Sequence, residues 1–389
     1  PLNPILGCYL HYRLVFFYFV NEVLVYNHLL RICFLFSILT PEKKEIVVIT
    51  GGSGFLGQHI VRQIQQHTAH VGEIRILDVK PVQKFMEYDD LIPTKTILSS
   101  VNDICGVRQA LHGADSVIHV AGLISYGTFP DINGMEKINI EGTDLYYVFY
   151  RLSNFKRLIF CSTVDVVIGH KDITNGTEET GIPDDFLFPG YPDTKFRAER
   201  LILELHTISL RPNVMYGEGD PYYVTTALRN AHDNNGVLIR VGDGSALFQQ
   251  TYVGNAAWAF LCADAALKNN PCRVSGQVFF VPDDTPLQNT FTFMNYFLKD
   301  QNLNLSRFYL PWKFVYVTLY FMELVLKALK PLIKLSLPAQ SCSVKYINMN
   351  LYFSPQKSRQ LLGYKPFYSP HQSLEKSFYI CDGGLLYHC

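Results

Sequence analysis

The strongest constraint on the fold is the stretch 46–57, in which a run of β-branched apolar residues leads directly into a glycine-rich turn. Such a run is typical of a buried parallel strand, and residues 55–67 can continue as a helix. In a unit of this kind, Gly51 permits the tight turn, Gly54 lets a pyrophosphate approach the backbone, and Gly57 lets the helix pack closely on the strand. The N–H groups at the start of the helix would face the phosphates. The sequence therefore predicts a dinucleotide site, although its G-x-x-G-x-x-G spacing differs from the commoner G-x-G-x-x-G.

A second predicted strand, residues 73–77, ends in an acidic residue, Asp78, which lies 21 residues after Gly57. A carboxylate at this point can accept hydrogen bonds from the hydroxyls of the adenosine ribose, and it repels a 2′-phosphate. We therefore predict NAD as the cofactor in preference to NADP. The cation Lys80, two residues later, weakens that preference.

The composition favours a small-molecule partner. The 389 residues, 48% of them hydrophobic, can form a substantial core in one large or two moderate domains. Lysine plus arginine equals aspartate plus glutamate at 34 each, without a long basic run, so we expect no nucleic-acid partner. The nine cysteines form no C-x-x-C pair and no Cys/His ligand spacing, which predicts reduced thiols and no metal site.

Strands and helices continue to alternate beyond the second strand. The predicted strands are 95–98, 116–120 and 157–161, and the predicted helices are about 102–111 and 139–153. This order predicts an α/β fold, a Rossmann-like, doubly wound parallel sheet with helices on both faces. His119 lies within an apolar strand and is interpreted as a core histidine. The small residues Ala121 and Gly122, which follow the same strand, would leave room for the cofactor.

Two pairs of side chains indicate chemistry near the end of the fifth strand. Ser162 and Thr163 follow this strand directly, where open α/β sheets place their ligands. Tyr191 and Lys195 are four residues apart in a helical pattern, so they share one face of a helix. A lysine ammonium beside a phenol favours the phenolate and lowers its pKa, which makes tyrosine a usable base near neutral pH.

These motifs together resemble the extended short-chain dehydrogenase/reductases, and further stretches resemble the 3β-hydroxysteroid dehydrogenase/Δ5-Δ4 isomerase family in particular. The resemblance covers about residues 46–380. The motifs that carry it are residues 50–57, Ser162-Thr163, Tyr191-x-x-x-Lys195, Leu210-Arg-Pro212, Tyr216-Gly-Glu-Gly219, Tyr252-Val-Gly-Asn-Ala-Ala-Trp258, Asp283-Asp-Thr-Pro286 and Gly363-Tyr-Lys-Pro366.

The resemblance implies NAD-dependent oxidation of a 3β-hydroxy-Δ5-steroid to the 3-ketone in steroid biosynthesis, with a shift of the double bond into conjugation. Tyr191 would take the hydroxyl proton, and Lys195 would lower the pKa of the tyrosine and hold the nicotinamide ribose. Thr163, with Ser162 as its substitute, would hydrogen-bond the substrate oxygen, and Asn139 would support the site. The implied cofactor contacts are Gly51, Gly54, Phe55, Leu56, Gly57, Asp78, Ser100, Ala121 and Lys195.

Three features depart from the family pattern. Ser100 stands where an aspartate usually contacts the adenine, with Asp103 three residues later. Thr163 replaces the more usual serine, which keeps the donor and adds a methyl group. The chain between Glu204 and His206 is shorter than in the family, and a helix that ends and reverses direction needs several residues. A splice or gene-model defect that prevents folding is one interpretation of this shortening.

We divide the chain into an apolar extension (1–41), an NAD-binding domain with the Tyr/Lys pair (42–212), a substrate-binding lobe (213–380) and a tail (381–389). The extension begins without methionine, and neither of its apolar runs reaches the ~20 residues that span a bilayer, so it is either a membrane anchor or an artefact of the sequence. In residues 312–335 the charged side chains of Glu323, Lys327, Lys330 and Lys334 interrupt an apolar surface, which predicts a helix lying in a membrane interface or, alternatively, an ordinary buried helix.

The expected partners are a steroid and a membrane, and a homodimer is left open. The predicted location is the endoplasmic reticulum membrane with the catalytic domain in the cytosol, or alternatively a mitochondrial membrane. Two other functions remain open. One is a sterol-4-carboxylate 3-dehydrogenase, which loses CO2 instead of shifting a double bond, and the other is a non-catalytic, membrane-associated NAD-binding protein. The sequence does not identify the steroid or the acid and base of an isomerase.

Overall fold

The computed structural model describes residues 44–152, 155–330, 335, 337 and 339–378. The predicted N-terminal extension, residues 1–41, and the tail, residues 381–389, lie outside the described residues.

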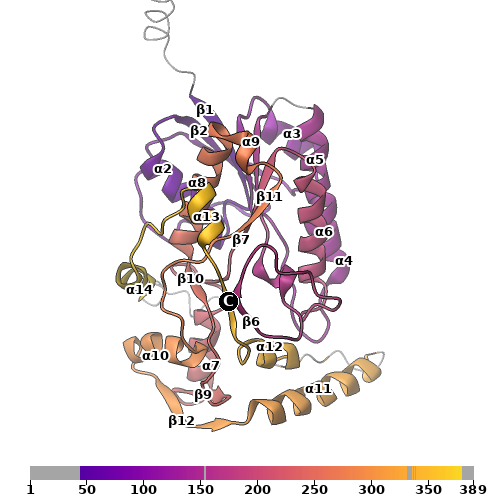
Figure 1. Cartoon of the computed structure of the whole chain (residues 1–389), viewed down its shortest axis with the longest axis vertical. Helices are drawn as coiled ribbons and strands as arrows, with labels where there is room; N and C mark the ends of the chain where they lie inside the picture. The colour runs from indigo at the N-terminus through magenta and orange to yellow at the C-terminus, as the bar shows by residue number, and fades with distance from the viewer. Residues whose placement is uncertain (1–43, 153–154, 331–334, 336, 338, 379–389) are drawn as a thin grey trace, which may run out of the picture. The chain divides into compact units, whose positions relative to one another are not determined.

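A seven-stranded parallel sheet forms the centre of the described part of the chain (Figure 1). Its order is β11-β7-β5-β4-β1-β2-β3, so the chain runs outward from β1 to β3, returns to β4, and runs outward again to β11. This confirms the predicted doubly wound sheet, whose order reverses between β1 and β4. The strands are β1 (Glu45–Thr50), β2 (Val71–Asp78), β3 (Thr94–Leu98), β4 (Ser116–His119), β5 (Arg157–Cys161), β7 (Thr207–Arg211) and β11 (Gln277–Phe280).

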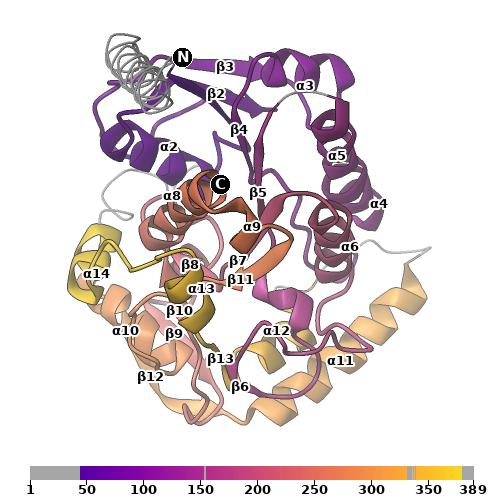
Figure 2. The ribbon, with the colours of Figure 1, turned by 45° about the horizontal axis from the view of Figure 1, so that its top comes forward.

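Helices cover both faces of this sheet (Figure 2). One face carries α2 (Phe55–His67) and α8 (Val253–Asn269), and the other carries α3 (Ile104–Leu111), α5 (Gly142–Leu152) and α6 (Tyr191–Leu203). Strand β1 contributes side chains to the hydrophobic cores on both faces of the sheet, because successive side chains of a strand point to opposite faces. Val47 and Ile49 belong to the core under α2, whereas Val48 belongs to the core under α3 and α5. The long apolar runs that predicted these strands are therefore explained by burial on two sides.

The predicted helices agree closely with the observed ones, and two differences have local causes. The helix α3 begins at Ile104, because the side chain of Asp103 accepts hydrogen bonds from the N–H groups of Cys105 and Gly106 and so caps it. The helix predicted to start at Asn139 is preceded by α4 (Ile132–Met135) and a π-helical turn, η1 (Glu136–Glu141), which runs directly into α5.

The remaining elements form three two-stranded parallel pairs and several short helices. The pairs are β8 (Val214–Tyr216) with β10 (Gln250–Tyr252), β9 (Val237–Val241) with β12 (Asn304–Leu310), and β6 (Ile173–Gly176) with β13 (Leu351–Phe353). The other helices are η2 (Val164–Val167), α7 (Val224–Asp233), α9 (Pro271–Val274), α10 (Thr290–Asp300), α11 (Trp312–Leu329), α12 (Ser341–Tyr346), α13 (Gln356–Leu361) and α14 (Pro370–Phe378). Among the described residues, no helix combines the length and apolarity needed to cross a bilayer.

The short link after α6 is compatible with the fold. Three residues join the end of α6 at Leu203 to β7 at Thr207. The N–H of Leu205 donates to the carbonyl of Ile202 at 3.0 Å, and the Thr207 hydroxyl donates to the same carbonyl at 2.7 Å. These bonds satisfy the last turn of the helix while the chain reverses over three residues.

Candidate active site

The glycine-rich turn joins β1 to α2 in the geometry that its sequence predicts. Gly51 has φ +70°, and its N–H donates to the Leu77 carbonyl of the neighbouring strand at 2.9 Å. A Cβ at Gly57 would lie 2.1 Å from the Gly51 oxygen, so the close approach of helix and turn requires glycine there. Gly54, the N-cap of α2, supplies no capping side chain, which leaves the N–H groups of the first turn available to an anion.

Asp78 lies beside this turn at the end of β2. Its carboxylate accepts hydrogen bonds from the N–H groups of Ser53 at 3.0 Å and Lys80 at 3.1 Å, which fix its orientation next to the glycine residues. The bare glycine backbone, the open helix N-terminus and this acid are the features that bind the pyrophosphate and ribose of a dinucleotide. The residues present therefore fit NAD.

The adenine edge of the proposed cofactor site has a different structure from the family pattern. Ser100 is partly buried, and its carbonyl accepts the N–H of Asp103 at 3.0 Å. The Asp103 carboxylate accepts the Ser99 hydroxyl at 2.6 Å and caps α3, and these hydrogen bonds lower its pKa. Asp103 is therefore committed to the helix cap, and a contact between Ser100 and the adenine stays a prediction.

The two hydroxyls after β5 have distinct environments. The Oγ of Ser162 is buried and has no hydrogen-bond partner among the described residues. The Oγ1 of Thr163 accepts the N–H of Asp165 at 3.2 Å, which caps the short helix η2. An orphaned buried hydroxyl is costly, so Ser162 requires a partner that a bound cofactor or substrate would supply.

Tyr191 and Lys195 lie in the first turns of α6, as their spacing predicts. Tyr191 is buried, with 9% of its surface exposed. Lys195 is also buried, and its Nζ lies 4.2 Å from the centre of the Phe160 ring on β5. A Cβ added to Gly122 would be 3.7 Å from this Nζ, which places Lys195 against the chain that leaves β4. The fold thus brings the predicted Tyr/Lys pair to the carboxyl ends of β4 and β5.

Burial is the largest influence on the pKa values of Tyr191 and Lys195. Burial raises the pKa of Tyr191 well above its ordinary value, and the nearby thiol of Cys161 and carboxylate of Asp165 raise it further. Burial lowers the pKa of Lys195, with Cys161 and Glu199 opposing that effect. In the chain by itself, the phenol pKa is therefore raised, and the lowering that the sequence predicts from Lys195 does not appear because desolvation dominates.

Asn139 joins the turn after β4 to α6. Its Oδ1 accepts the N–H of Leu123 at 2.7 Å, and its Nδ2 donates to the Leu123 carbonyl at 2.9 Å and to the Thr194 hydroxyl at 3.0 Å. Asn139 lies in the π-helical turn η1, a distortion that is frequent at functional sites. These contacts tie the helix of Tyr191 and Lys195 to the chain that follows β4, and the supporting role of Asn139 stays a prediction.

Asp165 is a further candidate for the site, and the sequence motifs did not indicate it. It is 8% exposed, and its carboxylate accepts the hydroxyls of Tyr346 at 3.1 Å and Tyr126 at 3.4 Å. Burial raises its pKa, and these hydrogen bonds only partly oppose the shift. The signal in the sequence was an acid inside an otherwise apolar run directly after Ser162 and Thr163.

A surface cavity of about 1240 Å³ borders the glycine turn. It touches the turn through Ser53 and contains none of the predicted catalytic residues. Its walls come from the segment 80–89, from Gln58 and Gln66 of α2, and from the loop at Glu218. This cavity is therefore separate from the chemistry at α6.

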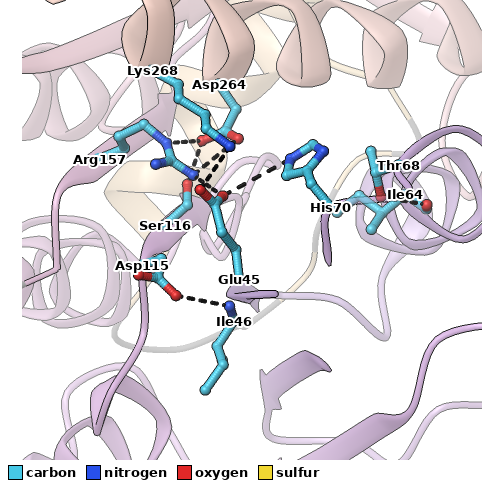
Figure 3. Close-up of polar contacts among 10 residues, drawn as sticks. All are labelled: Glu45, Ile46, Ile64, Thr68, His70, Asp115, Ser116, Arg157, Asp264 and Lys268. Carbon is cyan, nitrogen blue, oxygen red and sulfur yellow. Dashed lines mark hydrogen bonds and ion pairs between the residues drawn. The ribbon is translucent and has the colours of Figure 1, made fainter. Parts of the chain in front are cut away.

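Within the part of the chain that the structure describes, one group of acidic and histidine side chains lies close enough together to hold a metal ion: Glu45, His70 and Asp264. Two cations occupy it instead (Figure 3). Arg157 donates to Glu45 at 2.5 Å and to Asp264 at 2.8 Å, and the Lys268 ammonium lies 2.8 Å from Glu45. Because both carboxylates are already neutralised and hydrogen-bonded, this group fits an ion-pair network that joins β1, β5 and α8, and it does not fit a divalent metal.

The chain matches the model of the 3-beta hydroxysteroid dehydrogenase/isomerase family over residues 48–312, more than half of its length. A sterol-4-alpha-carboxylate 3-dehydrogenase (decarboxylating) of Candida albicans is 29% identical over 343 residues, covering 84% of this chain and 94% of that protein. Among solved structures, an epimerase of Methanothermobacter thermautotrophicus has a TM-score of 0.65 at 17% identity, covering 88% of this chain and 94% of that one. A dTDP-glucose 4,6-dehydratase of Bacillus anthracis in complex with NAD has a TM-score of 0.63 at 14% identity, covering 87% of this chain and 96% of that one. At these identities the structural likenesses support the fold alone.

Proposed function

The chain belongs to the 3-beta hydroxysteroid dehydrogenase/isomerase family, and we propose that it is an NAD-dependent oxidoreductase that oxidises the 3-hydroxyl of a sterol. The observation that carries this proposal is the position of Tyr191 and Lys195 in α6, directly against the end of β5 that bears Ser162 and Thr163. A base, a cation and two hydroxyl donors at one edge of a dinucleotide-binding sheet are the groups that an alcohol oxidation needs.

The proposal gives each of these side chains a defined role. The Thr163 hydroxyl donates to the sterol oxygen, and the Tyr191 phenolate takes the hydroxyl proton. Lys195 stabilises that phenolate and holds the nicotinamide ribose, while the glycine turn and Asp78 hold the rest of the dinucleotide. Bound NAD supplies the acceptor for the hydride of C3 and a positive charge that favours the phenolate. Burial raises the pKa of Tyr191 in the chain by itself, and the charge of a bound cofactor would oppose that shift.

For the specific substrate and reaction, we propose oxidation of a sterol 4α-carboxylate with loss of CO2. The support is the similarity to the Candida albicans enzyme over 94% of its length. Oxidation at C3 produces a β-keto acid, which loses CO2 readily because the electron pair is delocalised into the new carbonyl. The second candidate is oxidation of a 3β-hydroxy-Δ5-steroid followed by isomerisation, which the description of the family favours.

A single assay separates these candidates. The purified protein is incubated with NAD and either a 4α-carboxysterol or pregnenolone, and NADH absorbance, CO2 and the ultraviolet absorbance of a conjugated ketone are recorded. We expect NADH and CO2 in equal amounts from the carboxysterol. A conjugated ketone from pregnenolone without turnover of the carboxysterol would favour the isomerase. Binding of NAD without NADH from either sterol would identify a non-catalytic protein.

We also propose that α11 docks on a lipid surface. One face of this helix packs on α12, where the Glu323 carboxylate accepts the N–H and the hydroxyl of Ser341 at 2.7 and 2.9 Å. The opposite face exposes large apolar side chains, with Phe314 71% and Phe321 62% exposed. Phe308 of β12, which is 87% exposed, lies just before this helix in the chain. Figure 1 shows α11 along the outer edge of its lobe, with α12 on its inner side.

The positions of the lysine side chains at the two ends of α11 favour a membrane interface as the partner of its exposed apolar face. Lys313 follows Trp312 at one end of α11, and Lys327 and Lys330 lie at the other end, all three exposed. Apolar side chains flanked by tryptophan and lysine suit the boundary between acyl chains and anionic headgroups. A sterol enzyme gains from this arrangement because its substrate is dissolved in the bilayer. Location in the endoplasmic reticulum remains a prediction that subcellular fractionation would test.

Vesicle flotation tests this docking. We expect the wild-type protein to float with vesicles of phosphatidylcholine and phosphatidylserine, and the double variant Phe314→Ser, Phe321→Ser to lose at least tenfold in vesicle binding. The matched control is Tyr222→Ser, because Tyr222 is 63% exposed and lies outside α11. A wild-type protein that does not float, but whose mass in light scattering halves in the double variant, would assign the same face to a second copy of the chain.

A further inference from the structure

Asp165 lies close to the hydroxyls and the tyrosine of the candidate active site. It lies in η2, directly after the two hydroxyls at the end of β5, and its own N–H is bonded to Thr163. The Tyr126 ring, whose hydroxyl donates to Asp165, meets the Tyr191 ring edge to face with 5.9 Å between centres. The carboxylate and the proposed base thus border the same group of side chains.

The groups that face this carboxylate are polar but uncharged. They are the hydroxyls of Tyr126 from the chain after β4, Tyr346 from α12 and Thr163 from its own turn, together with Tyr191 of α6. In the described part of the chain, no lysine, arginine or histidine forms an ion pair with Asp165, in contrast to the buried Glu199, which pairs with Arg211. A buried carboxyl without a cation is expensive to keep ionised and is typical of a group that exchanges protons in function.

The proposed reaction requires a proton donor besides Tyr191. Loss of CO2 from the β-keto acid leaves the electron pair of the broken C4–carboxyl bond as an enolate, and C4 must then gain a proton. The double-bond shift of the second candidate reaction needs a related group, because a proton leaves C4 and another is added at C6. In either reaction the Tyr191 hydroxyl would be hydrogen-bonded to the oxygen at C3, so a different group must donate the proton to carbon.

Resting on the proposed function, we infer that Asp165 is the acid that protonates the sterol carbon skeleton after oxidation at C3. The steps balance. The C3–H bond breaks as hydride passes to NAD, Tyr191 takes the hydroxyl proton, and the C4–carboxyl bond breaks to release CO2. A new C4–H bond forms with the Asp165 proton, and the resulting carboxylate is neutralised by the proton that Tyr191 took. One sterol carboxylate and one NAD+ therefore give one ketone, one CO2 and one NADH with no net proton.

The raised pKa of Asp165 agrees with this role, since it keeps a larger share of the carboxyl protonated near neutral pH. The tyrosine hydroxyls that border it would serve two purposes. They hold the carboxyl in place, and they stabilise the carboxylate that remains after the proton has left.

The main test is Asp165→Asn, which keeps the shape and removes the proton. The enzyme is incubated with NAD and a 4α-carboxysterol without a 4-methyl group in D2O, and NADH, the keto acid, the ketone and the position of deuterium at C4 are followed. We expect the wild-type enzyme to place deuterium on one face of C4. In the variant the ratio of ketone to NADH should fall at least tenfold in the early phase, with keto acid accumulating and deuterium on both faces. Asp165→Glu should restore the single face.

A second measurement does not depend on the folding of the Asn variant. Tyr346→Phe removes one hydrogen bond to the carboxylate, which raises the pKa of Asp165, so the pH at which the ketone-to-NADH ratio is half-maximal should move upward. The role of Asp165 would be overturned if Tyr346→Phe left the pH dependence of the ketone-to-NADH ratio unchanged. It would also be overturned if Asp165→Asn kept the wild-type ratio of ketone to NADH and placed deuterium on one face of C4. Neither outcome would contradict the proposed oxidation at C3. A wild-type enzyme that forms no NADH from either sterol would overturn the proposed function, and the role of Asp165 with it.

Discussion

Gly54→Ala separates cofactor binding from folding. The backbone at Gly54 has φ −85° and ψ −178°, which alanine adopts without strain. The nearest heavy atom that the new Cβ would meet is the Gly51 oxygen at 3.3 Å, a tight contact that a small shift relieves. Removing glycine from an allowed conformation also stabilises a protein by about 0.4–1 kcal/mol through the unfolded chain. The variant should therefore fold with a Tm close to that of the wild type.

Binding of NAD should nevertheless weaken by at least tenfold, because the methyl group occupies the space through which the pyrophosphate reaches the helix N-terminus. The effect is measurable as thermal stabilisation. Ligand at 100 times Kd stabilises a protein by about 2.7 kcal/mol, and a tenfold loss of affinity reduces this to about 1.4 kcal/mol. With an unfolding entropy of about 2.1 cal/mol/K per residue, NAD should raise the Tm of the wild type by about 3 °C and that of the variant by about 2 °C.

Two control variants are compared with Gly54→Ala. The Tm of each protein is measured by scanning fluorimetry with and without NAD, and its affinity for NAD is measured by calorimetric titration. Gly181→Ala has an ordinary φ and open space around its Cβ, so it should change neither Tm nor affinity. Gly57→Ala would place its Cβ 2.1 Å from the Gly51 oxygen, so it should lower the Tm itself. An unchanged Kd in Gly54→Ala would refute the placement of the pyrophosphate at this turn.

Three further outcomes are expected. Tyr191→Phe should abolish NADH formation while Kd for NAD changes less than threefold, and residual turnover near the wild-type rate would remove this residue as the base. Arg157→Met should lower the free energy of unfolding in urea by about 3–5 kcal/mol because it leaves the carboxylates of its network without their shared cation, whereas Lys95→Met, at an exposed pair, should cost less than about 1 kcal/mol. Burial lowers the pKa of His59 to about 4 and of His119 to about 3, so below pH 6.5 the unfolded chain binds protons that the folded chain does not. Stability should therefore fall by roughly 2 kcal/mol per histidine between pH 6.5 and 5, and a flat urea-unfolding profile over that range would contradict it.

Local pattern predicted most of the central domain. The strands β1 to β5 and the helix α2 follow from apolar runs and helical spacing, because burial on two sides of a parallel sheet leaves a continuous signal in a few neighbouring residues. The interpretation of His119 as a core residue is also confirmed, since its two ring nitrogens contact the hydroxyls of Thr50 and Thr143 at 2.7 and 3.0 Å. The π-helical turn at Asn139 was missed because a one-residue change of helical period leaves no local signal.

The features of the candidate site also fall into those that the sequence predicted and those that only the structure showed. The sequence by itself determined the glycine turn, the acid at the end of β2, and a tyrosine and a lysine on one helical face, since each depends on residues close together in the chain. Only the tertiary structure decided that the Ser162 hydroxyl is orphaned and that Asp165 lies among tyrosines from α12 and from the chain after β4. It also decided that Arg157 joins Glu45 to Asp264. These contacts join residues 39 to 181 positions apart, and the crossovers of the sheet bring them together, so no local pattern records them.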